Sequence, residues 1–252
     1  MRALAAMRLG LVTVVLVLAS VAIGPSPSSA VSGPWTLGTF VPLTGGVGDC
    51  PAGYLCSNFK VTACPNVSLD ASGELAQASP TSGTPKGVAV FFSGGLGDTW
   101  WKTGVGIAAD LLTRLHEQDG LVVVQVRWID SWLKAASGED AGSAHLACRP
   151  ATVVKWVHDT IYAPLGLTPA LGQCGFCITG NSGGASQVSY ALSNFGLDTI
   201  LNAVIPTGGP PHAAQYKGCL PGFVGYAYNT TQVQHIDLSY TSIIRSADRA
   251  MA

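Results

Sequence analysis

Ser182 lies between glycines in the stretch CITGNSGGAS, residues 177–186, which fits the pattern G-x-S-x-G. The chain has 31 glycines among 252 residues, so a match to so short a pattern also arises by chance. Two interpretations follow: a nucleophilic serine on a sharp turn, or a small residue in a structural or phosphate-binding turn. The chain has neither a G-x-G-x-x-G motif nor a Walker lysine, which favours the nucleophile.

The residues around Ser182 predict a strand, a turn and a helix. The apolar run GFCIT, residues 175–179, is typical of a buried strand, and the pattern from Gly183 to Asn194 predicts a helix that stops at Gly196. A nucleophile on such a turn has strained backbone geometry and needs small neighbours, which the surrounding glycines supply. The helix would place its first amides and the positive end of its dipole beside the serine.

Elements of the same kind recur along the chain. The stretches from Ser57 and Gly73 predict short exposed strands, before strands and helices alternate. This alternation predicts the α/β class, with a mostly parallel sheet and helices on both faces. Besides the strand before Ser182, the predicted strands are 88–92, 121–128 and 199–206, and the further helices are 103–118 and 150–166.

The carboxyl ends of the predicted strands lead into polar or glycine-rich segments. In a parallel sheet these ends meet at one edge, where the chemistry of such folds is located. We therefore expect one site to collect Ser93–Gly97, Trp128–Trp132, Asn181–Gly183 and Thr207–His212.

Residues 1–30 have the pattern of a secretory signal peptide. Arg2 and Arg8 precede an apolar run from Leu9 to Gly24, and small residues lead up to Ala30. The run is short for a membrane-spanning helix, so we expect export and no stable membrane span after the signal is removed. Residues 31–252 suffice for a single domain.

The composition of residues 31–252 excludes some classes of protein. Without Arg2 and Arg8, 11 of the 13 basic residues remain against 14 acidic ones, a net charge of −3. Nucleic-acid binding would need a clustered basic face, and the sequence gives no sign of one. The low charged fraction, 11%, and the 20 aromatic residues are typical of a compact domain rather than a disordered chain.

Seven cysteines in an exported chain predict structural disulfides. Three of them lie in or near an N-terminal extension at residues 31–56. The pair Cys174-x-x-Cys177 has no second ligand pair for zinc, and it precedes a strand rather than opening a helix as a thioredoxin-like motif does. The odd number leaves one cysteine unpaired. All seven are Cys50, Cys56, Cys64, Cys148, Cys174, Cys177 and Cys219.

The stretches GNSGG and FFSGGLGDTWW give the chain, over about residues 57–210, a resemblance to the α/β-hydrolase family in its secreted esterase and lipase-like branch. The resemblance implies an oxyanion hole formed by the amide of Gly183 and by one amide of Gly94, Gly95 or Leu96, with Gly95 as our choice. Ser93 stands where many members of the family have histidine. Backbone amides donate in such a hole, so this difference leaves it intact.

The other triad residues follow less directly from the sequence. By family order an acid and then a histidine should come after Ser182. His212, just past the predicted strand 199–206, is our candidate base, although a histidine at such a place is more commonly just an exposed loop residue. Asp198 falls at the opposite edge of the sheet, and Asp237 and Asp248 follow His235 in the wrong order.

Two explanations cover the missing acid and base. The sequence could be truncated, with residues 212–252 as a lid or insertion region and the last strands beyond it. Alternatively, a hydrolase-like scaffold serves binding instead of catalysis, with Ser182 inert. We expect the first.

We therefore expect a secreted serine hydrolase that cleaves small or lipid-like carboxylic esters through an acyl-enzyme at Ser182, with no metal or organic cofactor. The alternatives are a peptidase or acyltransferase on the same fold and a non-catalytic binding protein. Tryptophans near strand ends could line an apolar pocket, although large aromatic residues at such places more often pack in the core. The residues expected to contact substrate are Asn181, Gly94, Leu96, Trp100 and Trp128.

Overall fold

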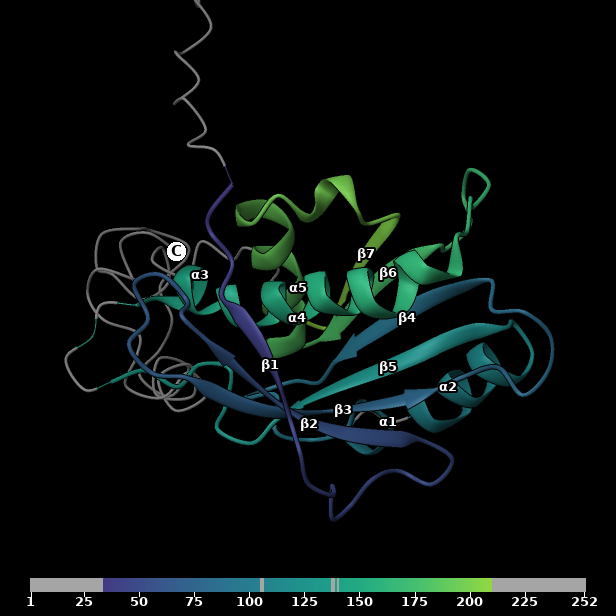
Figure 1. Ribbon diagram of the computed structural model, residues 1–252, viewed down its shortest axis with the longest axis horizontal. Helices are drawn as coiled ribbons and strands as arrows, with labels where there is room; N and C mark the ends of the chain where they lie inside the picture. Colours follow the sequence, from purple (N-terminus) through teal and green to yellow (C-terminus); the bar gives the residue numbers. More distant parts are fainter. Residues whose placement is uncertain (1–33, 105–106, 137–138, 140, 210–252) are drawn as a thin grey trace, which may run out of the picture. The chain divides into compact units, whose positions relative to one another are not determined.

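A computed structural model describes residues 34–104, 107–136, 139 and 141–209 of the chain. These residues form a seven-stranded sheet in the order β1-β2-β3-β5-β4-β6-β7 (Figure 1). The strands are β1 Thr39–Leu43, β2 Leu55–Thr62, β3 Ala71–Ala78, β4 Gly87–Phe92, β5 Leu121–Trp128, β6 Phe176–Asn181 and β7 Ala203–Thr207.

The sheet is mixed, and the prediction of a mostly parallel sheet is confirmed. Strands β5, β4, β6 and β7 are parallel to one another, whereas β1, β2 and β3 join as an antiparallel meander at the β5 edge. Because β2 again points the same way as β5, five of the seven described strands share one direction. The carboxyl ends of β4, β5, β6 and β7 therefore meet at one edge of the sheet.

Helices cover both faces of the sheet, as predicted (Figure 1). On one face lie α3 Ser143–Leu146, α4 Cys148–Val157 and α5 Gly183–Asn194, and on the other lie α1 Trp101–Gly104 and α2 Ala108–Glu117. Alternate residues of β4 supply the two cores: Val90 and Phe92 pack with α4 and α5, whereas Phe91 packs with α2. A strand buried on both faces reads as a continuous apolar run, which is why the sequence revealed it.

Several element boundaries differ from those predicted. The helix expected at 103–118 is α1 and α2, and the helix expected at 150–166 is α4 followed by a π-helical turn, His158–Tyr162, and a 3₁₀ turn, Ala163–Leu165. A 3₁₀ turn, Leu197–Thr199, occupies the start of the strand expected at 199–206. The prediction that β3 is exposed was wrong, because it lies between β2 and β5 in the sheet and is mostly buried.

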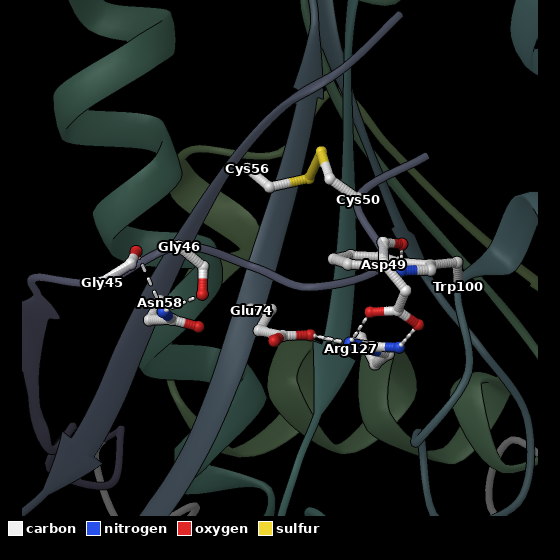
Figure 2. A network of polar contacts seen from close by, with 9 residues as sticks. All are labelled: Gly45, Gly46, Asp49, Cys50, Cys56, Asn58, Glu74, Trp100 and Arg127. Atoms are coloured by element: carbon white, nitrogen blue, oxygen red, sulfur yellow. Dashed lines mark hydrogen bonds and ion pairs between the residues drawn. A yellow bond between two sulfur atoms is a disulfide. The ribbon is translucent and has the colours of Figure 1, made fainter. Parts of the chain in front are cut away.

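The residues before β2 are fixed to the sheet by an ionic network (Figure 2). Arg127 of β5 lies between the carboxylates of Asp49 and Glu74 and donates hydrogen bonds to both. Its guanidinium also lies 4.6 Å from the ring centre of Trp100, whose indole N–H donates to the Asp49 carbonyl at 3.0 Å. The hydrogen bonds from Arg127 lower the pKa of Asp49. This network ties the N-terminal extension to Trp100.

The prediction of structural disulfides is confirmed for the six cysteines among the described residues. The pairs are Cys50–Cys56, Cys64–Cys148 and Cys174–Cys177. Cys64–Cys148 joins the segment after β2 to the start of α4 across 84 positions of the sequence. Cys219 lies outside the described residues, as do the proposed signal peptide at 1–30 and the region 212–252. Within the described part of the chain, no helix has the length and apolar character needed to cross a bilayer.

Tyr54 should make stability fall at alkaline pH. Its side chain is 9% exposed, and its hydroxyl has no hydrogen-bond partner among the described residues. Burial raises the pKa of Tyr54 to about 12, so between pH 10 and pH 12 the unfolded chain has lost a proton that the folded chain keeps. Raising the pH through this window therefore favours unfolding, by about 1.4 kcal/mol at pH 11.

Tyr54→Phe removes this titration and leaves the ring packing in place. We expect the variant to be at least as stable as the wild type at pH 7, because the unpartnered hydroxyl is gone. Measured by urea unfolding, the unfolding free energy of the variant relative to that of the wild type should increase between pH 9 and pH 11. A difference between the two proteins that stays constant with pH would contradict the prediction.

Candidate active site

Ser182 occupies the turn between β6 and α5, as the sequence predicted. Its backbone has φ 53° and ψ −116°, a region that residues with a side chain rarely adopt. The turn is fixed on both sides: the Ser182 N–H donates to the Thr207 carbonyl at 2.8 Å, and the Ala185 N–H donates to the Ser182 carbonyl at 2.9 Å. The serine itself is exposed to solvent. Strained backbone that is held by its surroundings occurs most often at functional sites.

The glycines next to Ser182 are required by close packing. A Cβ atom on Gly184 would lie 2.2 Å from the carbonyl oxygen of Phe92, and one on Gly183 would lie 2.4 Å from that of Gly95. Helix α5 therefore begins directly against the segment that follows β4. The sequence-based expectation that these neighbours must be small is confirmed, and backbone contact is the reason.

The Ser93–Gly97 loop follows β4 and contacts the serine turn. The Gly97 N–H donates to the Gly94 carbonyl at 2.9 Å, which closes a tight turn, and Gly95 has φ 57°. A Cβ atom on Gly94 would lie 3.1 Å from the Ser182 Cβ, and one on Gly183 would lie 2.8 Å from the Gly95 nitrogen. The structure thus brings together Ser182, Gly183, Gly94 and Gly95, four of the residues that the sequence selected.

The backbone amides of Gly95, Leu96 and Gly183 are among those in this cluster that donate to no acceptor within the described residues. Gly183 is the first residue of α5, and the first amides of a helix have no partner within the helix. Unpaired amides beside a strained serine are the groups from which an oxyanion hole is built.

The segment after β5 holds the Ser93–Gly97 loop from the side. The Trp128 N–H donates to the Gly97 carbonyl at 2.8 Å, and the Trp132 N–H donates to the Leu96 carbonyl at 3.2 Å. The Trp132 indole N–H also donates to the Gly95 carbonyl at 3.3 Å. The carbonyls of Gly95, Leu96 and Gly97 therefore all accept hydrogen bonds from Trp128 and Trp132.

Arg149 supports this segment from α4. Its side chain is fully buried and donates to the carbonyls of Trp132 and Leu69, each at 2.7 Å. Burial lowers the pKa of Arg149 to about 10, which still leaves it charged at neutral pH. A buried charge needs such partners, so Arg149 fixes the position of the Trp132 backbone.

The predicted substrate-contact residues divide into two groups. Asn181 precedes Ser182, and its side chain lies near the backbones of Gly94 and Gly208. Leu96 follows Gly95 in the loop and is partly buried against the core. Trp128 and Trp100 are 1% and 3% exposed. Such burial is typical of core packing, the alternative given above, and their contact with a substrate stays a prediction.

The histidines among the described residues lie away from Ser182. His145 stacks on Trp35 with ring centres 4.5 Å apart, and His116 lies on α2 beside Tyr54. His158 pairs with Asp159 at 2.8 Å, but it packs on Phe176, at the amino end of β6 and roughly 20 Å of extended chain away from Ser182. His212, the candidate base, lies outside the described residues.

A cavity of about 790 Å³ lies on the sheet face beside α2. Its walls include Phe91, Leu115 and Ile205, and neither Ser182 nor the Ser93–Gly97 loop contributes to them. Within the described residues, no group of three or more His, Cys, Asp or Glu side chains is arranged to hold a metal ion.

The sheet order, the serine turn and the adjoining glycine loop define an α/β-hydrolase-like fold, which agrees with the fold implied by the sequence. Comparisons with protein-family models and with the sequences of curated proteins find no match.

Comparison with solved structures finds similar chains. Est1E from Butyrivibrio proteoclasticus is similar at 13% identity and a TM-score of 0.43, over 71% of this chain and 59% of that one. A hyperthermophilic esterase from the archaeon Pyrobaculum calidifontis is similar at 16% identity and a TM-score of 0.37, over 78% and 55% of the two chains. An acylaminoacyl peptidase from Pyrococcus horikoshii is similar at 14% identity and a TM-score of 0.40, over 70% and 26%. The chain thus spans less than two thirds of each of these proteins.

Proposed function

We propose that this protein is a serine hydrolase that cleaves carboxylic esters with Ser182 as the nucleophile. The observation that carries the proposal is the strained backbone of Ser182, exposed at the carboxyl end of β6 and in contact with the Ser93–Gly97 loop. A structural turn at this place would favour glycine, because a side chain adds about 1 kcal/mol or more of strain in this conformation. Retention of a serine is explained when its hydroxyl is used.

The reaction would form and hydrolyse an acyl-enzyme. The Ser182 hydroxyl oxygen attacks the ester carbonyl carbon while a general base, for which we propose His212, takes the proton. The amides of Gly183 and Gly95 hold the negatively charged oxygen of the tetrahedral intermediate. The intermediate collapses, the base returns the proton to the leaving alcohol, and water then releases the carboxylic acid by the same steps.

The surroundings of Ser182 support a small ester as substrate. Ser182 is exposed, with the backbone of Gly94 beside it, and we propose that Gly94, Leu96 and Asn181 contact the substrate. Esterases are also among the solved structures similar to this chain. Three disulfides among the described residues support export, with residues 1–30 as the proposed signal.

A fluorophosphonate probe tests the proposal directly. The folded chain, residues 31–252, is exposed to the probe and its intact mass is measured beside that of Ser182→Ala. We expect one adduct on the wild type and none on the variant, because the probe reacts only with an activated serine.

Ser131→Ala is the matched control. Ser131 is also a serine with positive φ, 68°, and it follows β5 at the same edge of the sheet. The Ser131→Ala variant should be labelled as fully as the wild type. A folded wild-type chain that takes up no probe, or a Ser182→Ala chain that is labelled as well as the wild type, would contradict the assignment.

A further inference from the structure

Gln187 is a fully buried polar residue on the second turn of α5, five residues after Ser182. Its side-chain oxygen accepts a hydrogen bond from the Trp128 indole N–H at 2.9 Å, and its side-chain nitrogen donates to the Ser93 carbonyl at 3.3 Å. Both ends of the amide are therefore engaged. A buried amide with two long-range partners holds those partners together.

The partners of Gln187 belong to two different strands. Trp128 is the last residue of β5, and Ser93 is the first residue after β4, where the Ser93–Gly97 loop begins. Through α5, Gln187 connects both to the helix that follows the nucleophile. Three neighbouring strand ends are thus joined by one side chain.

The loop is closely fitted around this side chain. A Cβ atom on Gly97 would lie 2.6 Å from Trp128 and 3.2 Å from the Gln187 side-chain nitrogen. Trp128 is fixed in turn by Phe59, whose ring meets it edge to face at 5.3 Å, and by its own N–H, which donates to the Gly97 carbonyl. A change at Gln187 is therefore transmitted to the loop that carries Gly95.

The chemistry of the two partners requires an amide. The indole N–H needs an acceptor and the carbonyl needs a donor, and glutamine is long enough to supply both from α5. A carboxylate would accept from Trp128 but could not donate to Ser93. An apolar side chain would leave both buried groups unpaired.

We propose that Gln187 is a positioning residue that sets the distance between the Gly95 and Gly183 amides and so completes the oxyanion hole. This inference rests on the proposed function for its catalytic role. Gln187 itself is buried behind the loop and does not touch the substrate.

The test compares Gln187→Leu and Gln187→Glu with Val188→Ala in the full exported chain. Val188 is the next residue of α5 and is also fully buried in the larger core, but its apolar side chain cannot form hydrogen bonds to the strand ends or the loop. We would measure kcat and KM for a small aryl ester and the inhibition constant of a boronic acid, which mimics the tetrahedral intermediate. Hydrogen exchange of the loop amides, of which the Gly97 N–H is hydrogen-bonded, reports loop position without requiring activity.

We expect Gln187→Leu to lower kcat by about 10- to 100-fold, with KM changed less than about threefold, because the lost interaction acts only in the transition state. Boronic acid binding should weaken in parallel with kcat. Val188→Ala should lose stability while keeping kcat within about threefold of the wild type. A Gln187→Leu enzyme with unchanged kcat and boronic acid affinity would overturn the proposal.

Gln187→Glu supplies a second test if the leucine variant does not fold. When protonated, the introduced carboxyl can both accept from Trp128 and donate to Ser93, as the amide does. Its kcat relative to the wild type should therefore fall as the pH rises, and a ratio that is flat with pH would contradict the inference.

Failure of the proposed function would be recognised separately. If the wild type neither turns over esters nor reacts with the probe at Ser182, the hydrolase assignment fails. The loop is still tested in that case: faster exchange of the loop amides in the Gln187 variants than in Val188→Ala supports the positioning role, and equal exchange excludes it.

Discussion

Ser182→Gly should abolish ester hydrolysis and at the same time stabilise the fold by about 1 kcal/mol. Loss of the nucleophile is expected to lower kcat by about 10⁴-fold or more. Glycine adopts φ 53° and ψ −116° without the strain that a Cβ atom causes. The stability increases because this relieved strain is larger than the free energy that glycine costs by making the unfolded chain more flexible. Opposite signs for activity and stability distinguish a strained functional residue from a structural one.

The measurement pairs turnover with urea unfolding. Ser182→Ala should be equally inactive without the gain in stability, because alanine retains the Cβ atom. Ser131→Gly, also at a positive φ of 68°, serves as the control for activity and should be fully active, while it loses the hydrogen bond that the Ser131 hydroxyl accepts from the Leu133 N–H. If Ser182→Gly is less stable than Ser182→Ala, strain at this position is not the reason for the unusual backbone.

Removal of the Cys64–Cys148 disulfide should cost about 4.5 kcal/mol of unfolding free energy. The cross-link closes a loop between positions 84 residues apart, and in the chain-entropy model the stabilisation grows with the logarithm of loop length. It also joins the segment after β2 to α4, two elements that are distant in sequence. The double variant Cys64→Ser with Cys148→Ser should therefore unfold at much lower urea concentration.

Cys50–Cys56 provides the internal comparison. It closes a loop between positions only six residues apart, for which the same model gives about 2.4 kcal/mol. We expect its double serine variant to lose roughly half as much stability. If the two variants lose equal amounts, loop entropy does not govern the contribution of these disulfides.

The parallel half of the sheet could be predicted from the sequence because its strands are buried on both faces. The runs at 88–92 and 121–128 became β4 and β5 almost residue for residue, and the helix 183–194 became α5. The meander was harder to predict. Strand β1, residues 39–43, was missed because its residues are mostly exposed or half-buried and lack a long apolar run, and β3 looks polar although its neighbours bury it.

Part of the site could be predicted from patterns of residue type in the sequence. Ser182 was selected by the G-x-S-x-G pattern and its setting between a predicted strand and helix, whereas Gly183 and Gly95 were selected by the resemblance to the α/β-hydrolase family, and the structure brings the three together. Gln187 and Arg149 were missed, since a single buried polar residue in a helix pattern carries no signal of its own. Their partners lie 59 and 94 residues away for Gln187 and 17 and 80 for Arg149.

The backbone of Gly95 has a consequence for laboratory evolution of this protein. A Cβ atom at this position would meet nothing within 4 Å, so glycine is needed there for its φ of 57° and not for lack of space. Asparagine and aspartate tolerate this conformation at modest cost. Because the Gly95 amide belongs to the main chain, a library at position 95 would vary the side chain presented beside Ser182 while the amide itself is retained.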